Sequence, residues 1–160
     1  MIELVLSGLE ATRSLARRLA PTLCAGDVIG LAGPLGAGKT TLARDLIEAL
    51  AAAGGGGPVG EVPSPTFTLV QIYETGAVPV WHFDLYRLER PADALELAIE
   101  EAFAGAISLI EWPERLGEMM PADWLELRIE RESDGARRAV IRGHGSRGLA
   151  IERALQEAAP

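Results

Sequence analysis

Residues 33–40 read Gly-Pro-Leu-Gly-Ala-Gly-Lys-Thr and match the pattern G-x-x-x-x-G-K-[ST] at every fixed position. Such a stretch, a Walker A loop, turns successive backbone N–H groups into one concavity that suits phosphate oxygens. Gly36 and Gly38 permit positive φ angles and let a phosphate approach without a Cβ in the way. The pattern predicts that Lys39 reaches the β- and γ-phosphates of a nucleotide and that the Thr40 hydroxyl binds Mg²⁺.

The residues on either side of this loop favour a strand before it and a helix after it. Residues 28–32 form a short apolar run typical of a buried strand, and leucines at 42, 46 and 50 have the spacing of an amphipathic helix over about 39–53. A chance match in a glycine-rich turn is the alternative, and it would require neither element. Strand, loop and helix in this order therefore predict a nucleotide-phosphate site.

The composition is that of one globular domain over residues 1–160, with 48% hydrophobic and 24% charged residues. No apolar run approaches the roughly 18–20 residues of a membrane span, and the first residues lack the features of a signal peptide. The single cysteine, Cys24, cannot form an internal disulfide. These observations predict a cytoplasmic protein with no membrane partner.

The net charge of −8 argues against direct binding of nucleic acid, which normally needs a basic face. The basic residues are scattered, apart from small clusters at 17–18 and 137–138. We therefore expect that any role on a nucleic acid runs through another protein.

Two later segments place polar residues close to predicted strands. Thr66, within Ser-Pro-Thr-Phe at 64–67, either senses the γ-phosphate as a switch residue or begins a strand after a proline turn. His82 and Asp84 are two residues apart in an apolar run, so their side chains share one face of a strand. That face meets either a site or solvent.

Glu111 closes another apolar run, residues 106–111. An acid at the carboxyl end of such a strand holds Mg²⁺ directly or through water, which is the Walker B arrangement. A strand also ends in an acid simply because the chain reaches solvent there. The loop upstream favours the metal interpretation.

The remaining patterns predict the other elements of an α/β chain. Helices are expected over residues 7–23, with Ser7 as N-cap, and over 90–103. The last third predicts an antiparallel hairpin, a loop and a short terminal helix, over residues 124–142, 143–148 and 149–155.

Four motifs, in this order, make the sequence similar to the TsaE (YjeE) family: residues 33–41, 64–67, 82–87 (His-Phe-Asp-Leu-Tyr-Arg) and 110–114 (Ile-Glu-Trp-Pro-Glu). The family comprises small bacterial P-loop ATPases of tRNA threonylcarbamoyladenosine synthesis. The resemblance spans nearly the whole chain. It implies an α/β, three-layer P-loop NTPase-like domain with a mixed, mainly parallel sheet.

The resemblance also implies a set of site residues. ATP would lie on the loop, with Mg²⁺ held by Thr40 and Glu111. Lys39 and Thr66, as the switch residue, would serve catalysis, and Asp84 would serve catalysis or the outer metal shell. The residues implied to bind the nucleotide are Thr12, Leu35, Gly36, Ala37, Gly38, Lys39, Thr40, Thr41 and Trp112.

This chain departs from the family at one position of the loop. The family usually carries an acid where this chain has Pro34. Proline supplies no N–H, but the phosphate nest is built mainly from the N–H groups that follow it. Nucleotide binding is therefore expected to survive, although this chain lacks the family's carboxylate at that position.

The implied partners are TsaB and TsaD, of which TsaD transfers a threonylcarbamoyl group to the tRNA adenosine beside the anticodon. ATP hydrolysis would support multiple turnover by that pair, and tRNA would be contacted only indirectly. Hydrolysis by the isolated chain is expected to be slow because no obvious arginine finger accompanies the loop. Arg87 is one candidate for that role, and a residue of a partner is another.

Three other functions share parts of this pattern. A small-molecule kinase usually needs an arginine-rich lid, and no arginine cluster follows the predicted helix at 90–103. A regulatory GTPase normally selects guanine through Asn-Lys-x-Asp, and this chain contains no asparagine. A non-hydrolysing nucleotide-binding module shares every binding residue, so the sequence leaves it open.

Overall fold

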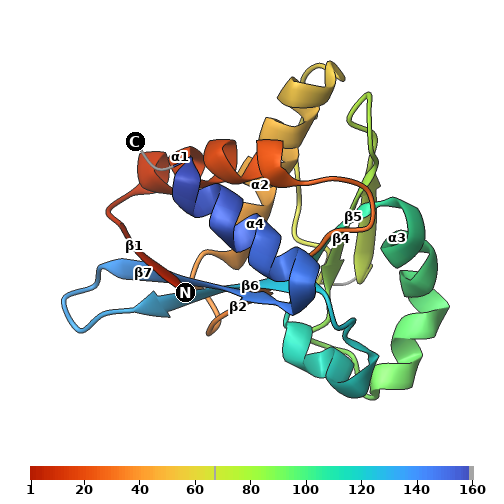
Figure 1. Ribbon diagram of the computed structural model, residues 1–160. Coiled ribbons are helices and arrows are strands. Elements are labelled where there is room, and N and C mark those ends of the chain that lie inside the picture. The colour runs from red at the N-terminus through yellow and green to blue at the C-terminus, as the bar shows by residue number, and fades with distance from the viewer. Residues whose placement is uncertain (67, 159–160) are drawn as a thin grey trace.

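A seven-stranded mixed sheet crosses the centre of the molecule in the computed structural model (Figure 1). The structure describes residues 1–66 and 68–158. The strands lie in the order β1-β7-β6-β2-β5-β4-β3. Their bounds are Ile2–Leu6 (β1), Val28–Ala32 (β2), Val70–Tyr73 (β3), Val80–Asp84 (β4), Ile107–Glu111 (β5), Trp124–Arg131 (β6) and Arg137–His144 (β7).

Most of these strands run in one direction. β6, β2, β5 and β4 pair in parallel in that order. β1 runs with them, because β7 is antiparallel to both β6 and β1. Among the described strands, β7 and β3 run the opposite way. The mixed, mainly parallel sheet expected from the sequence is confirmed.

Helices cover both faces of the sheet, which explains why every residue of β2 and β5 is buried. α1 (Leu9–Leu19), α2 (Lys39–Gly54) and α4 (Gly145–Glu157) pack on one face. α3 (Ile99–Gly105) packs on the other, with the 3₁₀ segments Pro91–Leu97 and Pro113–Met119. The three layers are thus confirmed. No helix in the described part of the chain is long and apolar enough to cross a membrane.

Two helices begin or continue differently from the sequence prediction. Ser7 is not the N-cap of α1: the helix begins at Leu9, and Gly8 (φ 146°) takes the cap without a side-chain bond. The single helix expected over 90–103 is two pieces, because Ala98 adopts a left-handed conformation (φ 57°). Its N–H closes a 3₁₀ turn on the Leu95 carbonyl, and α3 then starts in a new direction.

The prediction of a loop over residues 143–148 is also wrong. β7 continues to His144, and α4 begins at once with Gly145 (φ 69°). Asp123, from the segment before β6, caps this helix by accepting a hydrogen bond from the Arg147 N–H over 2.9 Å. A Cβ at Gly145 would collide with that same carboxylate, so only glycine fits this tight entry.

Candidate functional site

The loop between β2 and α2 has the shape that its sequence predicts. Gly33, Gly36 and Gly38 have φ angles of 140°, 73° and 111°, which side chains rarely tolerate. α2 begins at Lys39, so its first N–H groups point into the concavity of the loop. The neighbouring strand β6 packs closely against the start of the loop, since a Cβ at Gly33 would lie 2.5 Å from the carbonyl oxygen of Ile129 in β6.

The Lys39 ammonium lies inside this concavity. Its Nζ donates hydrogen bonds to the carbonyl oxygens of Gly33, over 2.7 Å, and Pro34, over 2.8 Å. It also lies 4.2 Å from the centre of the Trp112 ring, within cation–π range. Burial lowers the pKa of Lys39 from its ordinary value, although nearby carboxylates, Glu111 foremost, act in the opposite direction.

Trp112 reaches the lysine through a strained backbone. It follows β5 directly and has a φ of 61°, uncommon for a bulky residue. Its indole contacts both Lys39 and the ring of Tyr86, whose centroid is 4.9 Å away. Such strain persists where the surroundings impose it, often at functional sites.

The Glu111 carboxylate is held at both of its oxygens. The Thr40 hydroxyl donates to Oε1 over 2.8 Å, and Oε2 lies 2.7 Å from His82 Nε2. Glu111 and His82 are 2% and 0% exposed, so this carboxylate lies inside the protein and not at a solvated strand end. The parallel register of β4 and β5 makes the contact possible, since His82 is opposite Leu109, two residues before Glu111.

These oxygens fit a magnesium ion. A hydroxyl and a carboxylate side by side are hard oxygen ligands of the kind that Mg²⁺ prefers. The described residues contain no group of three or more His, Cys, Asp or Glu placed to hold a metal. Mg²⁺ at Thr40 and Glu111 would therefore complete its shell with phosphate and water, which is usual for this ion.

Asp84 ends β4 directly opposite Glu111. Its Oδ2 accepts hydrogen bonds from the hydroxyls of Thr66, over 2.9 Å, and Ser64, over 3.3 Å. Its Oδ1 accepts the N–H of Tyr86 over 3.0 Å. Because Asp84 is 4% exposed and His82 is completely buried, the face that they share lies inside the protein and not in solvent. Phe67, the last residue of the 64–67 motif, lies outside the described residues.

A cavity of about 280 Å³ joins these groups. It brings together ten of the residues singled out from the sequence: Leu35, Gly36, Gly38, Lys39, Thr40, Thr41, Thr66, Asp84, Glu111 and Trp112. Ser64 and Arg137 complete its lining. Neither was given a role from the sequence, although Ser64 belongs to a quoted motif and Arg137 to a noted basic cluster. Each is a polar residue that follows residues typical of a turn, and the local sequence gives no other indication of its position in the fold.

Two residues expected at the nucleotide do not line this cavity. Ala37 is completely buried within the loop, and its N–H donates a hydrogen bond to the Pro34 carbonyl oxygen over 3.2 Å. Thr12 lies in the first turns of α1, 8% exposed, with its hydroxyl 3.5 Å from the Gly8 carbonyl oxygen. Its role beside the adenine stays a prediction.

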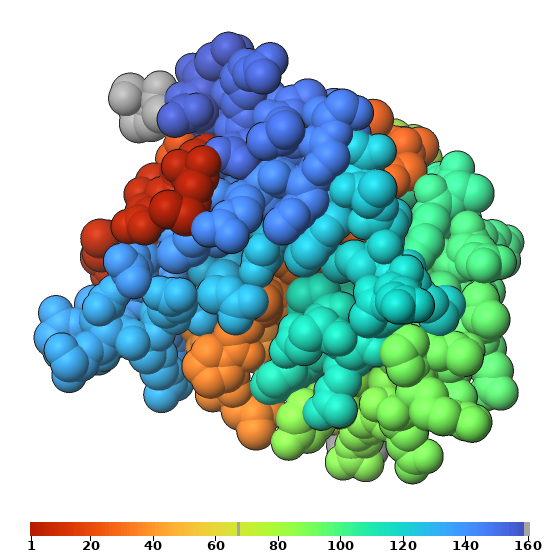
Figure 2. Space-filling view, turned by 60° about the horizontal axis from the view of Figure 1, so that its bottom comes forward, coloured from red at the N-terminus to blue at the C-terminus, as the bar shows by residue number. Residues whose placement is uncertain are grey.

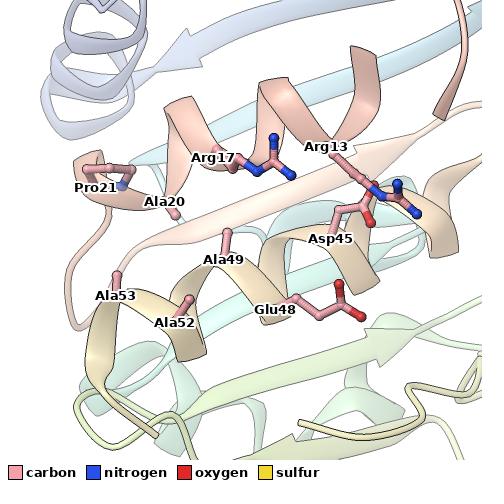
Figure 3. Close-up of a pocket in the computed structure, with 9 residues that line it drawn as sticks. All are labelled: Arg13, Arg17, Ala20, Pro21, Asp45, Glu48, Ala49, Ala52 and Ala53. Atoms are coloured by element: carbon pink, nitrogen blue, oxygen red, sulfur yellow. The ribbon is translucent and has the colours of Figure 1, made fainter. Parts of the chain in front are cut away.

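A second hollow, of about 520 Å³, lies between α1 and α2 (Figure 3). Its floor is made mainly of alanines of α2, and Arg13 and Arg17 of α1 face Asp45 and Glu48 across it. Burial raises the pKa of Asp45. None of the residues predicted to bind phosphate or metal lies here, so we place the candidate chemistry in the smaller cavity at the loop.

Comparisons with known proteins agree with this geometry. A sequence profile of the family described as "Threonylcarbamoyl adenosine biosynthesis protein TsaE" matches residues 6–140. The chain is 36% identical to the "tRNA threonylcarbamoyladenosine biosynthesis protein TsaE" of Rickettsia felis, over 93% of this chain and 84% of that protein. It is 35% identical to the protein of the same name from Bacillus subtilis, over 86% and 83% of the two chains.

A solved structure has the same arrangement of elements. The chain described as "Crystal structure of Bacillus subtilus YdiB" superposes with a TM-score of 0.77 at 27% sequence identity. The match covers 98% of this chain and 94% of that one. The likeness therefore extends over the whole α/β fold and is not confined to the loop and its two flanking elements.

Proposed function

This chain belongs to the TsaE family of tRNA threonylcarbamoyladenosine biosynthesis proteins, and from that premise we propose that it is a Mg²⁺-dependent ATPase. One observation carries the proposal. A Walker A lysine, its neighbouring Thr40 and the strand-end acid Glu111 meet in one cavity, with the Thr40 hydroxyl 2.8 Å from the carboxylate. Local sequence patterns made each of these residues a candidate, and the fold places them together.

In this proposal the residues divide into three roles. Lys39 and the N–H groups of the loop bind the phosphates and stabilise the charge that develops on the transferring phosphoryl group. Thr40 and Glu111 hold Mg²⁺, which supplies Lewis-acid neutralisation of the phosphate oxygens when bound. Binding and positioning of this kind account for most of the catalysis expected of such a site.

Asp84 is the proposed group that positions or activates the attacking water. Its Oδ2 is already an acceptor for two hydroxyls, Ser64 and Thr66, so the same oxygen can accept a water that replaces one of them. The Thr66 hydroxyl is also 2.7 Å from that of Ser64. Nucleotide binding that displaces the Thr66 hydroxyl from Asp84 would therefore also affect the segment that carries Thr66 and Ser64. This supports the switch role proposed for Thr66.

We propose further that the ATPase acts with the TsaB–TsaD pair in threonylcarbamoylation of tRNA, and contacts tRNA only through that pair. The net charge of −8 supports a protein partner over a direct grip on the tRNA backbone. Slow hydrolysis by the isolated chain, with stimulation by the pair, is the expected behaviour.

The test is phosphate release from Mg-ATP by the purified protein, alone and with TsaB and TsaD of the same organism. Lys39→Ala is the matched control, because it removes the cation of the loop. Stimulation by the pair that is lost in Lys39→Ala would support an ATPase working within the tRNA-modifying complex. Tight ATP binding with no hydrolysis in either setting would overturn it and favour a nucleotide-binding regulatory module.

A further inference from the structure

The strand ends next to the turn of the β6–β7 hairpin lie beside the phosphate loop: in Figure 2 the orange loop borders the blue hairpin, whose tip projects away from it. Arg131, the last residue of β6, is directly opposite Arg137, the first residue of β7. Arg131 Nη2 donates a hydrogen bond to the Gly36 carbonyl oxygen over 2.5 Å, and Arg137 Nη2 reaches the same oxygen over 3.5 Å. Two guanidinium groups thus point at one carbonyl of the loop.

The two arginines differ in how they are held. The hydrogen bond of Arg131 is short, and its side chain does not line the cavity. The bond of Arg137 is at the limit of hydrogen-bond distance, and its side chain does line the cavity. Arg137 also lies over the loop, because a Cβ at Gly38 would be 2.8 Å from its Nη1. Arg131 is therefore the anchor of the loop, and Arg137 needs to give up only a weak contact to turn towards a ligand.

The charges around Arg137 also support a role for its guanidinium in binding a ligand. Like charges facing each other in a ladder destabilise a hairpin. The next residue, Arg138, shows how this chain usually satisfies an arginine: it forms ion pairs with Glu3, Glu130 and Glu132 on the other face of β7. No carboxylate in residues 1–66 and 68–158 forms such a pair with Arg137. In a chain of net charge −8, this guanidinium is kept free of acids beside a phosphate-binding loop.

We propose that Arg137 binds the terminal phosphates of the nucleotide, so that this chain supplies its own phosphate-binding arginine; the inference rests on the proposed function. Arg137 lines the same cavity as Asp84 and Thr66, the groups proposed to act at the γ-phosphate, although β7 and β4 lie on opposite sides of β2 in the sheet. On nucleotide binding, the guanidinium leaves the Gly36 carbonyl oxygen and donates to phosphate oxygens, which suit its planar fork. Arg137 is then a further candidate, beside Arg87 and a residue of a partner, for the arginine that acts at the phosphates.

The experiment compares the binding of ADP and of the non-hydrolysable triphosphate AMP-PNP, each with Mg²⁺, by isothermal titration calorimetry. For Arg137→Ala we expect AMP-PNP affinity to fall about 10- to 100-fold, the range for a hydrogen bond between charged groups, with a much smaller change for ADP. Arg137→Lys should recover part of the loss, because it keeps the charge without the fork. Arg138→Ala, in the neighbouring position on the opposite face, should keep the parental ratio of the two affinities.

The outcomes separate this inference from the function on which it rests. A parental protein that binds neither nucleotide would overturn the proposed function, and the inference with it. A parental protein that binds both, with an Arg137→Ala variant of unchanged AMP-PNP to ADP ratio, would leave the function standing and refute the inference. Equal losses for both nucleotides would also refute it, since Arg137 would then only shape the loop. A thermal melt of each variant without nucleotide shows that the folded state is retained.

Discussion

The chain has two histidines, each beside a glutamate, and comparing the two pairs tests how burial affects the contact with the carboxylate of Glu111. Each histidine places its Nε2 close to a glutamate Oε2: His82 with Glu111 over 2.7 Å, and His144 with Glu126 over 3.0 Å. The first pair has side chains 0% and 3% exposed, and the second 34% and 18%. Replacing each histidine with alanine therefore removes the same chemical contact, once from a buried site and once from a partly exposed site.

We expect His82→Ala to lower the free energy of unfolding by about 2.5–5 kcal/mol. The lost hydrogen bond to a carboxylate contributes about 1.5–3 kcal/mol, and the space left by a completely buried ring adds about 1–2 kcal/mol. For His144→Ala we expect about 0.7–2.5 kcal/mol: roughly 0.2–1 for an exposed pair, plus about 0.5–1.5 for its stacking on Trp124. Urea denaturation of both variants at pH 7 measures the difference.

A loss from His144→Ala equal to or larger than that from His82→Ala would refute the reasoning, because burial would then not set the cost. The same variant has a functional readout. His82 orients the Glu111 carboxylate towards Thr40, so its removal should raise the Mg²⁺ concentration that half-saturates nucleotide binding by about 10- to 100-fold, as outer partners of metal ligands typically do. His144→Ala should leave that concentration unchanged.

Three further outcomes are expected. Lys39→Ala should abolish productive ATP binding, measured by calorimetry; parental affinity would contradict the role of the loop. Asp84→Ala should keep ATP binding but lose phosphate release, so a variant that hydrolyses at the parental rate would remove Asp84 from the mechanism. Burial would raise the pKa of Glu126, but hydrogen bonds from His144 and Arg128 outweigh it, and the net pKa lies below the ordinary value. The unfolded chain then binds the proton more readily than the folded protein. The stabilisation of the fold by Glu126 is therefore complete above about pH 4.5 and is lost as pH falls through the lowered pKa. Urea denaturation over this pH range measures the loss, and a midpoint that falls equally in Glu126→Gln would contradict it.

The sequence predicted the structure correctly wherever an element follows from a short local pattern. β2, the loop, the start of α2 and Glu111 at the end of β5 each follow from a short run of residues, because apolar periodicity and glycine placement act over a few positions. The hairpin of β6 and β7 was found for the same reason, since its turn and alternation are local. The resemblance to TsaE proteins then supplied the fold class.

What the sequence could not supply depends on the order and register of the strands. Arg137 reaches the loop only because β6 lies next to β2 in the sheet, and its neighbour Arg138 looks no different in the sequence. His82 meets Glu111 only through the register of β4 on β5. The break at Ala98 and the capping of α4 by Asp123 arise from packing between segments that local propensity does not see.

The indole of Trp112, in contact with both the Lys39 ammonium and Tyr86, gives the phosphate loop a built-in optical probe. A charge 4.2 Å from the ring centre shifts the energy of the excited indole, so its emission colour depends on where the ammonium lies. In the proposed function Lys39 turns from the Gly33 and Pro34 carbonyls to a phosphate, and the spectrum should then change without any added dye. Replacing the other two tryptophans, Trp81 and Trp124, with phenylalanine would leave a single emitter whose lifetime follows occupancy of the loop in real time.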